Sequence, residues 1–143
     1  MQSRVLGFIG LTLSAMAAAI AVSATSITPV QAHDDPAKPE YYSTHVKPIF
    51  DANCARCHSG INHRGGLNFD TRESLLKGGH SGKPAVIPGD PANSQMVILI
   101  RHDGPKEDPM DMPPHKDKLS DADIQTITDW IKAGAPMPRA AAQ

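Results

Sequence analysis

The stretch of sequence that decides the fold is VKPIFDANCARCH, residues 46–58. Its apolar residues recur every three or four positions, which predicts a helix with one buried face. The stretch ends in the pattern C-x-x-C-H, formed by Cys54, Cys57 and His58. Because the chain has no other cysteine, these two thiols and the adjacent imidazole are the strongest chemical signal in the sequence.

The C-x-x-C-H pattern is typical of a c-type haem attachment site. Two thiols three residues apart on one helical turn can each add to one vinyl group of a single porphyrin. His58 is then held beneath the ring, where an imidazole nitrogen can bind the iron. Three other readings are a redox disulfide, a structural disulfide, and a zinc site completed by His58 and His63. The histidine in register favours one haem c, attached through Cys54 and Cys57.

Residues 1–32 have the pattern of a secretory signal peptide. Arg4 is the only charged residue there, a long uncharged run follows it, and VQA at residues 30–32 offers a cleavage site. The run is long enough for an uncleaved membrane anchor, but its mild hydrophobicity favours cleavage. We therefore expect a periplasmic or otherwise exported protein, which meets the membrane only if this segment stays uncleaved.

Removal of residues 1–32 leaves 111 residues with few core-forming side chains. Val, Ile, Leu and Phe account for 18 of them, or 16%, a share at which a highly charged chain would be disordered. The net charge is only −2, from 13 Lys and Arg against 15 Asp and Glu, which gives no support to nucleic-acid binding. The core of such a chain is marginal on its own, so we expect a bound group to fill the interior and the apo-protein to be largely unfolded.

The rest of the chain is expected to be one domain, residues 43–138, after a flexible polar leader over residues 33–42. Glycine turn signals make residues 59–91 loop-dominated, with a short helical turn at 72–77. The apolar run at 96–100 fits a helix or a buried strand equally well, because periodicity alone does not separate the two.

A first helix is predicted over residues 41–58, with Ser43 or Thr44 as its cap. Pro48 fits this helix only if it begins just before the proline, whose missing N–H must fall among the unpaired donors of the first turn. A last helix begins at the N-cap Ser120 and is ended by Gly134.

Four stretches are together far more specific than the C-x-x-C-H pattern alone: VKPIFDANCARCH (46–58), GGLNFD (65–70), LLKGGHSGKPAVIPGDPANSQM (75–96) and MPPHKDKLSDADIQTITDWIKAGAP (112–136). They resemble the class I c-type cytochromes, and in detail the planctomycete-type cytochrome c domain. The resemblance implies an all-α fold, the small cytochrome c fold, in which N- and C-terminal helices pack over one covalently bound haem among long Gly- and Pro-rich loops. It also implies a one-electron carrier rather than an enzyme. Such a carrier exchanges electrons with redox partner proteins, either alone or as a subunit of a larger oxidoreductase.

Met112, in the loop before the last helix, is the candidate for the second axial ligand. A thioether is a soft, neutral ligand, and His/Met ligation raises the reduction potential of a haem. In similar cytochromes the distal Met also lies in a loop just ahead of the final helix. Met110 stays open as an alternative. A histidine as the second ligand would give a bis-His iron and a lower potential, and the candidates are His63, His80, His102 and His115. An open or displaceable distal site would instead suit a haem enzyme or ligand sensor.

Other residues have weaker signals. Arg64 and Lys83 flank glycine-rich turns and can pair with the haem carboxylates, although surface cations without function are commoner. Trp130 is expected to be a packing residue, or to direct its N–H to a haem carboxylate. The side chains expected beside the haem are Phe50, Leu99, Ile127 and Trp130.

Overall fold

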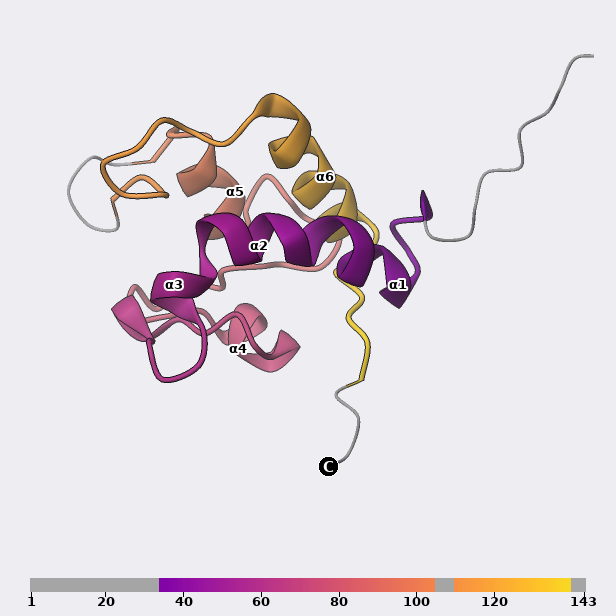
Figure 1. The fold of residues 1–143 in the computed structure, drawn as a ribbon, viewed down its shortest axis with the longest axis horizontal. Coiled ribbons are helices and arrows are strands. Elements are labelled where there is room, and N and C mark those ends of the chain that lie inside the picture. Colours follow the sequence, from indigo (N-terminus) through magenta and orange to yellow (C-terminus); the bar gives the residue numbers. More distant parts are fainter. Residues whose placement is uncertain (1–33, 105–109, 140–143) are drawn as a thin grey trace, which may run out of the picture.

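Residues 34–104 and 110–139, described in a computed structural model, form short helices joined by long loops (Figure 1). No strand occurs in this part of the chain, which confirms the all-α class. The predicted signal peptide lies outside the described residues. Within them, no helix has both the length and the apolar character needed to cross a bilayer.

The N-terminal helix consists of three consecutive segments, α1 (Pro39–Tyr41), η2 (Tyr42–Val46) and α2 (Lys47–Asn53). In the middle segment the turn is wider than in an α-helix, and the Lys47 N–H donates to the Tyr42 carbonyl five residues earlier. Pro48 follows directly, in the first turn of α2. The α-helix does begin just before Pro48, but the chain is already helical ahead of it, because the wider turn accommodates a residue without an N–H.

The folded part begins a few residues before the predicted boundary at Ser43. Tyr41 and Tyr42 belong to the predicted leader, yet both are buried in the apolar core. The chain is therefore already helical at Ser43 and Thr44, and the prediction that one of them caps the helix is wrong. Thr44 Oγ1 instead donates to the Glu40 carbonyl at 2.9 Å.

Four short elements follow, α3 (Ala55–His58), η3 (Arg64–Gly66), α4 (Arg72–Lys77) and α5 (Gln95–Ile100). α4 confirms the short helical turn, and its cap is Thr71, whose hydroxyl accepts the Ser74 N–H at 3.1 Å. α5 shows that the apolar run at 96–100 is a helix rather than a strand. One of its first N–H groups, that of Met96, is paired with the Ala85 carbonyl at 3.0 Å, so the loop before α5 supports the helix start.

The C-terminal helix, α6 (Asp121–Lys132), is formed as predicted. The Ser120 hydroxyl accepts the Asp123 N–H at 3.1 Å, and Gly134 ends the helix in a left-handed conformation with φ +100°. Its buried face carries an apolar stripe at helical spacing: Ile124, Ile127, Trp130 and Ile131.

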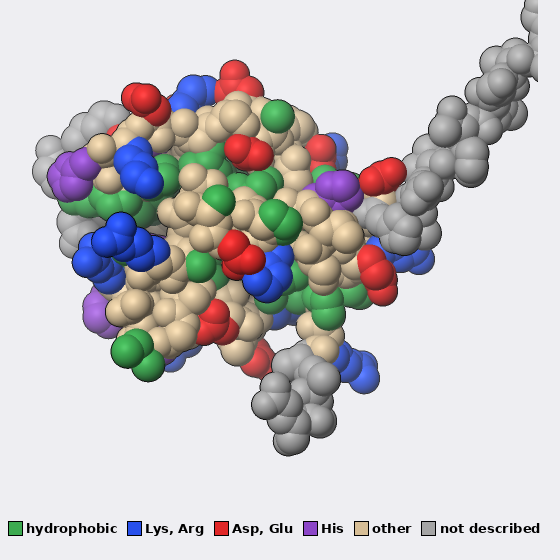
Figure 2. All heavy atoms as spheres, viewed as in Figure 1, with side chains coloured by type: hydrophobic (Ala, Val, Ile, Leu, Met, Phe, Trp, Pro, Cys, Tyr) green, Lys and Arg blue, Asp and Glu red, His purple; other side chains and the backbone are tan. Residues whose placement is uncertain are grey.

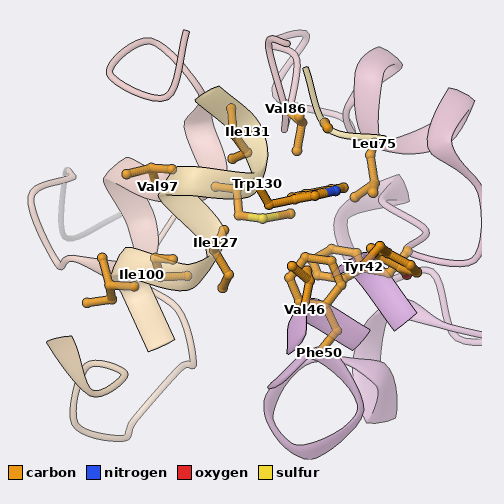
Figure 3. Close-up of a cluster of buried hydrophobic side chains, with 14 of the residues drawn as sticks. Tyr42, Val46, Phe50, Leu75, Val86, Val97, Ile100, Ile127, Trp130 and Ile131 are labelled. Atoms are coloured by element: carbon orange, nitrogen blue, oxygen red, sulfur yellow. The ribbon is translucent and has the colours of Figure 1, made fainter. Parts of the chain in front are cut away.

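α6 packs across the N-terminal helix at η2 and against α5 (Figure 1). Trp130 extends from α6 toward the N-terminal helix and is fully buried (Figure 3). Its ring centroid lies 5.5 Å from that of Tyr42 and 6.0 Å from that of Phe50. Its N–H donates to the Pro136 carbonyl at 2.8 Å, so Trp130 is the packing residue of this crossing, and its polar atom is already bonded.

Candidate haem site

Cys54 lies at the junction between α2 and α3. Its backbone, at φ −122° and ψ −39°, leaves the α-helical region and ends α2. Its carbonyl then accepts the N–H groups of Cys57 and His58, each at 3.0 Å. The predicted helix over residues 41–58 is therefore broken once, at Cys54, and the two thiols and the imidazole share one new helical turn.

His58 is held in one orientation by the loop that follows it. Its Nδ1 lies 3.3 Å from the Leu67 carbonyl, and its ring stacks on Phe69 with centroids 5.4 Å apart and planes 18° apart. A proton on Nδ1, shared with that carbonyl, leaves Nε2 with its lone pair for a metal. Burial lowers the pKa of His58 and so favours the neutral imidazole that can act as a ligand.

Both cysteines are free thiols. Burial, together with the neighbouring Cys57, raises the pKa of Cys54 to about 12, so Cys54 is protonated at neutral pH. No group of three or more His, Cys, Asp or Glu within the described ranges is placed to hold a metal ion. His63 is directed elsewhere, with Nε2 2.6 Å from Nδ2 of Asn68. Neither a disulfide nor a Cys/His zinc site finds support in this arrangement.

A cavity of about 790 Å³ opens beside the C-x-x-C-H turn. Its volume lies within the range of roughly 300–1,000 Å³ that is typical of ligand and cofactor pockets. Cys54, Cys57, His58 and Met112 all line it. Its apolar walls come from α2, α5, α6 and the loop after α3, and include Phe50, Leu67, Phe69, Leu99, Ile100 and Ile127.

The charged residues of the lining are all positive. They are Arg64 and Lys83, and none of the described lining residues is Asp or Glu. Two histidines, His80 and His115, also line the cavity. Figure 2 shows hydrophobic surface bordered by Lys, Arg and His side chains on this side, between α3 and the loop that precedes α6. The cavity thus suits a flat apolar group that carries carboxylates, and its thiols, imidazole and thioether are the donors that a haem c requires.

Residues 54–116 match the family described as Planctomycete cytochrome C. This segment is similar to the planctomycete-type cytochrome c domain. It begins at the first motif cysteine and includes Cys57, His58 and Met112, while α6 lies outside the matched range. Searches of curated proteins and of solved structures find no match. The match confirms the resemblance drawn from the sequence.

The matched segment brings several candidates for the second axial ligand to the cavity. Met112 packs against the core, and its N–H donates to the Leu99 carbonyl at 3.1 Å. Met110 also lines the cavity but is 38% exposed. Of the four candidate histidines, His80 and His115 line the cavity, whereas His63 and His102 do not.

Sequence reasoning identified part of the cavity wall. Three of the four side chains expected beside the haem line the cavity, and Trp130 lies behind Phe50 instead. The supports of His58, namely Leu67 and Phe69, were missed. Leu67 and Phe69 form an apolar pair two residues apart in an otherwise polar loop, which indicates two side chains on the same side of an extended segment but not which residue they contact. Leu67 holds His58 through its backbone carbonyl, which no side-chain pattern reveals.

Proposed function

We propose that this protein is an exported one-electron carrier with a single haem c, attached through Cys54 and Cys57 and ligated by His58 and Met112. The observation that carries the proposal is that the two thiols, the imidazole and the thioether line one apolar-walled cavity. The family match over residues 54–116 supports it, because every one of these residues lies in the matched range.

The haem, when bound, supplies an iron that alternates between the ferrous and ferric states. The chain supplies fixed ligands and a dry pocket. The Leu67 carbonyl orients the imidazole of His58, and the bond from the Met112 N–H to the Leu99 carbonyl ties the distal loop to α5. The apolar walls exclude water, and together with a His/Met ligand pair they favour a high reduction potential.

Covalent attachment is tested on a denaturing gel stained for haem. We expect a stained band at the size of the protein, and none for the variant in which both Cys54 and Cys57 are changed to Ala. A protein that is folded and active in electron transfer without covalently bound haem would overturn the proposal.

The distal ligand is tested by the absorption spectrum of the ferric protein. Met112→Ala should abolish the sulfur-to-iron charge-transfer band, whereas the control Met110→Ala should keep it. The second candidate function is a haem enzyme or ligand sensor, which needs an open or displaceable distal site. A high-spin ferric haem with Met112 intact would contradict the carrier and support this alternative.

Export is tested by mass spectrometry of the protein from the periplasmic fraction. We expect an N-terminus at His33 and loss of residues 1–32. A protein that retains residues 1–32 and sediments with membranes would show an anchor instead. Co-purification with an oxidoreductase under mild conditions would identify a subunit rather than a free carrier. In both cases the protein exchanges electrons with redox partner proteins.

A further inference from the structure

We propose that Arg64 and Lys83 bind the two carboxylates of the haem, an inference that rests on the proposed function. The lining of the cavity motivates it, because its apolar walls meet a rim that has cations and, among the described residues, no Asp or Glu. A carboxylate that leaves water needs a charged or hydrogen-bonding partner to offset its desolvation. The one buried indole N–H, that of Trp130, is already bonded to Pro136 and does not serve.

The two cations come from loops that are held against each other. The turn η3, which begins with Arg64, contacts residues 79–80, and the His80 N–H donates to the Gly65 carbonyl at 2.7 Å. A Cβ on Gly79 would lie only 2.2 Å from that carbonyl oxygen. A Cβ on Gly66 would lie 2.4 Å from the His80 ring. Glycines at 66 and 79 thus let the loops touch, and Arg64 reaches the same cavity as Lys83.

The loop that carries Lys83 is fixed on its other side to α5. Ser81 Oγ donates to Gln95 Oε1 at 2.7 Å and accepts the Lys83 N–H at 3.4 Å. Ser81 and Gln95 line the cavity together with Lys83. A Cβ on Gly78 would lie 1.9 Å from the Lys83 carbonyl oxygen, so this close backbone approach requires glycine. These contacts together set the backbone position of Lys83 at the rim.

Neither cation is neutralised by an acidic side chain that the structure describes. Within the described ranges, Arg64 and Lys83 form no ion pair with an acidic side chain. Other lysines do, since Lys47 pairs with Asp51 at 2.7 Å and Lys118 pairs with Asp121. Two cations without an acidic partner among the described residues, at the rim of a cavity whose described lining holds no Asp or Glu, match the two negative charges of the porphyrin in number and sign.

The test is the pH dependence of the reduction potential of the holoprotein. A cation within about 4–6 Å of a carboxylate lowers the pKa of that carboxylate by roughly 1–3 units. Ionisation of a haem carboxylate stabilises the ferric state, so the potential falls with pH across the range in which the carboxylates ionise. Arg64→Gln and Lys83→Gln should each move this range upward by about one pH unit, and the double variant should move it further.

The controls are Arg139→Gln and Lys132→Gln, which remove exposed cations that do not line the cavity and should leave the range in place. Arg64→Lys keeps the charge and should restore most of the wild-type behaviour. An unmoved range in either glutamine variant, with haem attached and the sulfur-to-iron band intact, overturns the assignment for that residue. Absence of covalent haem or of that band in the wild type overturns the proposed function instead, so the two failures are distinguishable.

Discussion

Asp70 closes the loop that follows the C-x-x-C-H turn. Its Oδ2 accepts the Gly60 N–H at 2.7 Å, and its own N–H donates to the Asn68 side-chain oxygen at 2.5 Å. Partial burial raises the pKa of Asp70, but hydrogen bonds from Gly60, Ser59 and Asn68 outweigh it and hold the pKa below its usual value of 3.8. The ionised carboxylate is therefore the form that stabilises this loop.

Asp70→Asn tests this role through pH. Because the folded pKa is lowered, the carboxylate stabilises the protein above its ordinary pKa, and this contribution is lost as the pH falls through the folded value. The variant should have a lower unfolding free energy than the wild type at pH 7, and the difference should shrink when the pH is lowered to about 3. Denaturant unfolding at both pH values measures it, and a difference of equal size at both would contradict the role.

Tyr42 gives a prediction for the stability of the protein at alkaline pH. Burial, followed by the charges of Asp51 and Asp70, raises the pKa of Tyr42 from 10.0 to about 12. Stability from the protonated phenol is fully present below pH 10 and is lost as the pH rises through the folded pKa. From pH 10 to 12 the wild type should lose more unfolding free energy than Tyr42→Phe. Unfolding is monitored by circular dichroism. Equal losses of unfolding free energy in the two proteins would refute this assignment.

At the scale of residues, the sequence indicates which groups do chemistry better than it indicates how they are held. Cys54, Cys57 and His58 are adjacent in the chain, so their pattern alone places them on one turn. The contacts that orient His58 come from Leu67 and Phe69, nine and eleven residues later. Such contacts depend on how a loop folds back, which no local pattern specifies.

At the scale of elements, the structure depends on the crossing of α6 with the N-terminal helix, and Trp130 occupies that crossing. Trp130→Ala should lower the unfolding free energy of the holoprotein by about 3–5 kcal/mol, since it removes a fully buried ring. Trp130→Phe should cost less, and Lys132→Ala, an exposed change on the same helix, almost nothing. A Trp130→Ala protein within 1 kcal/mol (about one buried methylene) of the wild type would show that the crossing does not depend on this ring.

α6 was predictable because its cap, apolar stripe and terminating glycine are all local signals. The cap of the N-terminal helix and the burial of its first turn were not, because Tyr41 and Tyr42 become core residues only through packing within the folded domain. α5 remained ambiguous in sequence, since its run of apolar residues is buried whether helical or extended. The loop carbonyls at residues 84–85, which accept the first N–H groups of α5, support the helix, and they come from outside the run.

At the scale of the whole molecule, a small set of apolar side chains surrounds a cavity of about 790 Å³. Without haem, those walls would face water or collapse, and the remaining core is marginal for a chain of this size. The variant with Cys54 and Cys57 both changed to Ala, isolated without haem, should therefore be largely unfolded by circular dichroism. A cooperative thermal transition in that apo-protein would contradict this prediction.

The central claim is a haem that His58 and Met112 hold for transfer of one electron. The most direct measurement is a potentiometric titration of the purified holoprotein with the absorption spectrum recorded at each potential. We predict a reversible one-electron transition between low-spin states, with the sulfur-to-iron band present in the ferric form and lost on reduction. A ferric protein that is high-spin, or a transition that is irreversible, would contradict the claim.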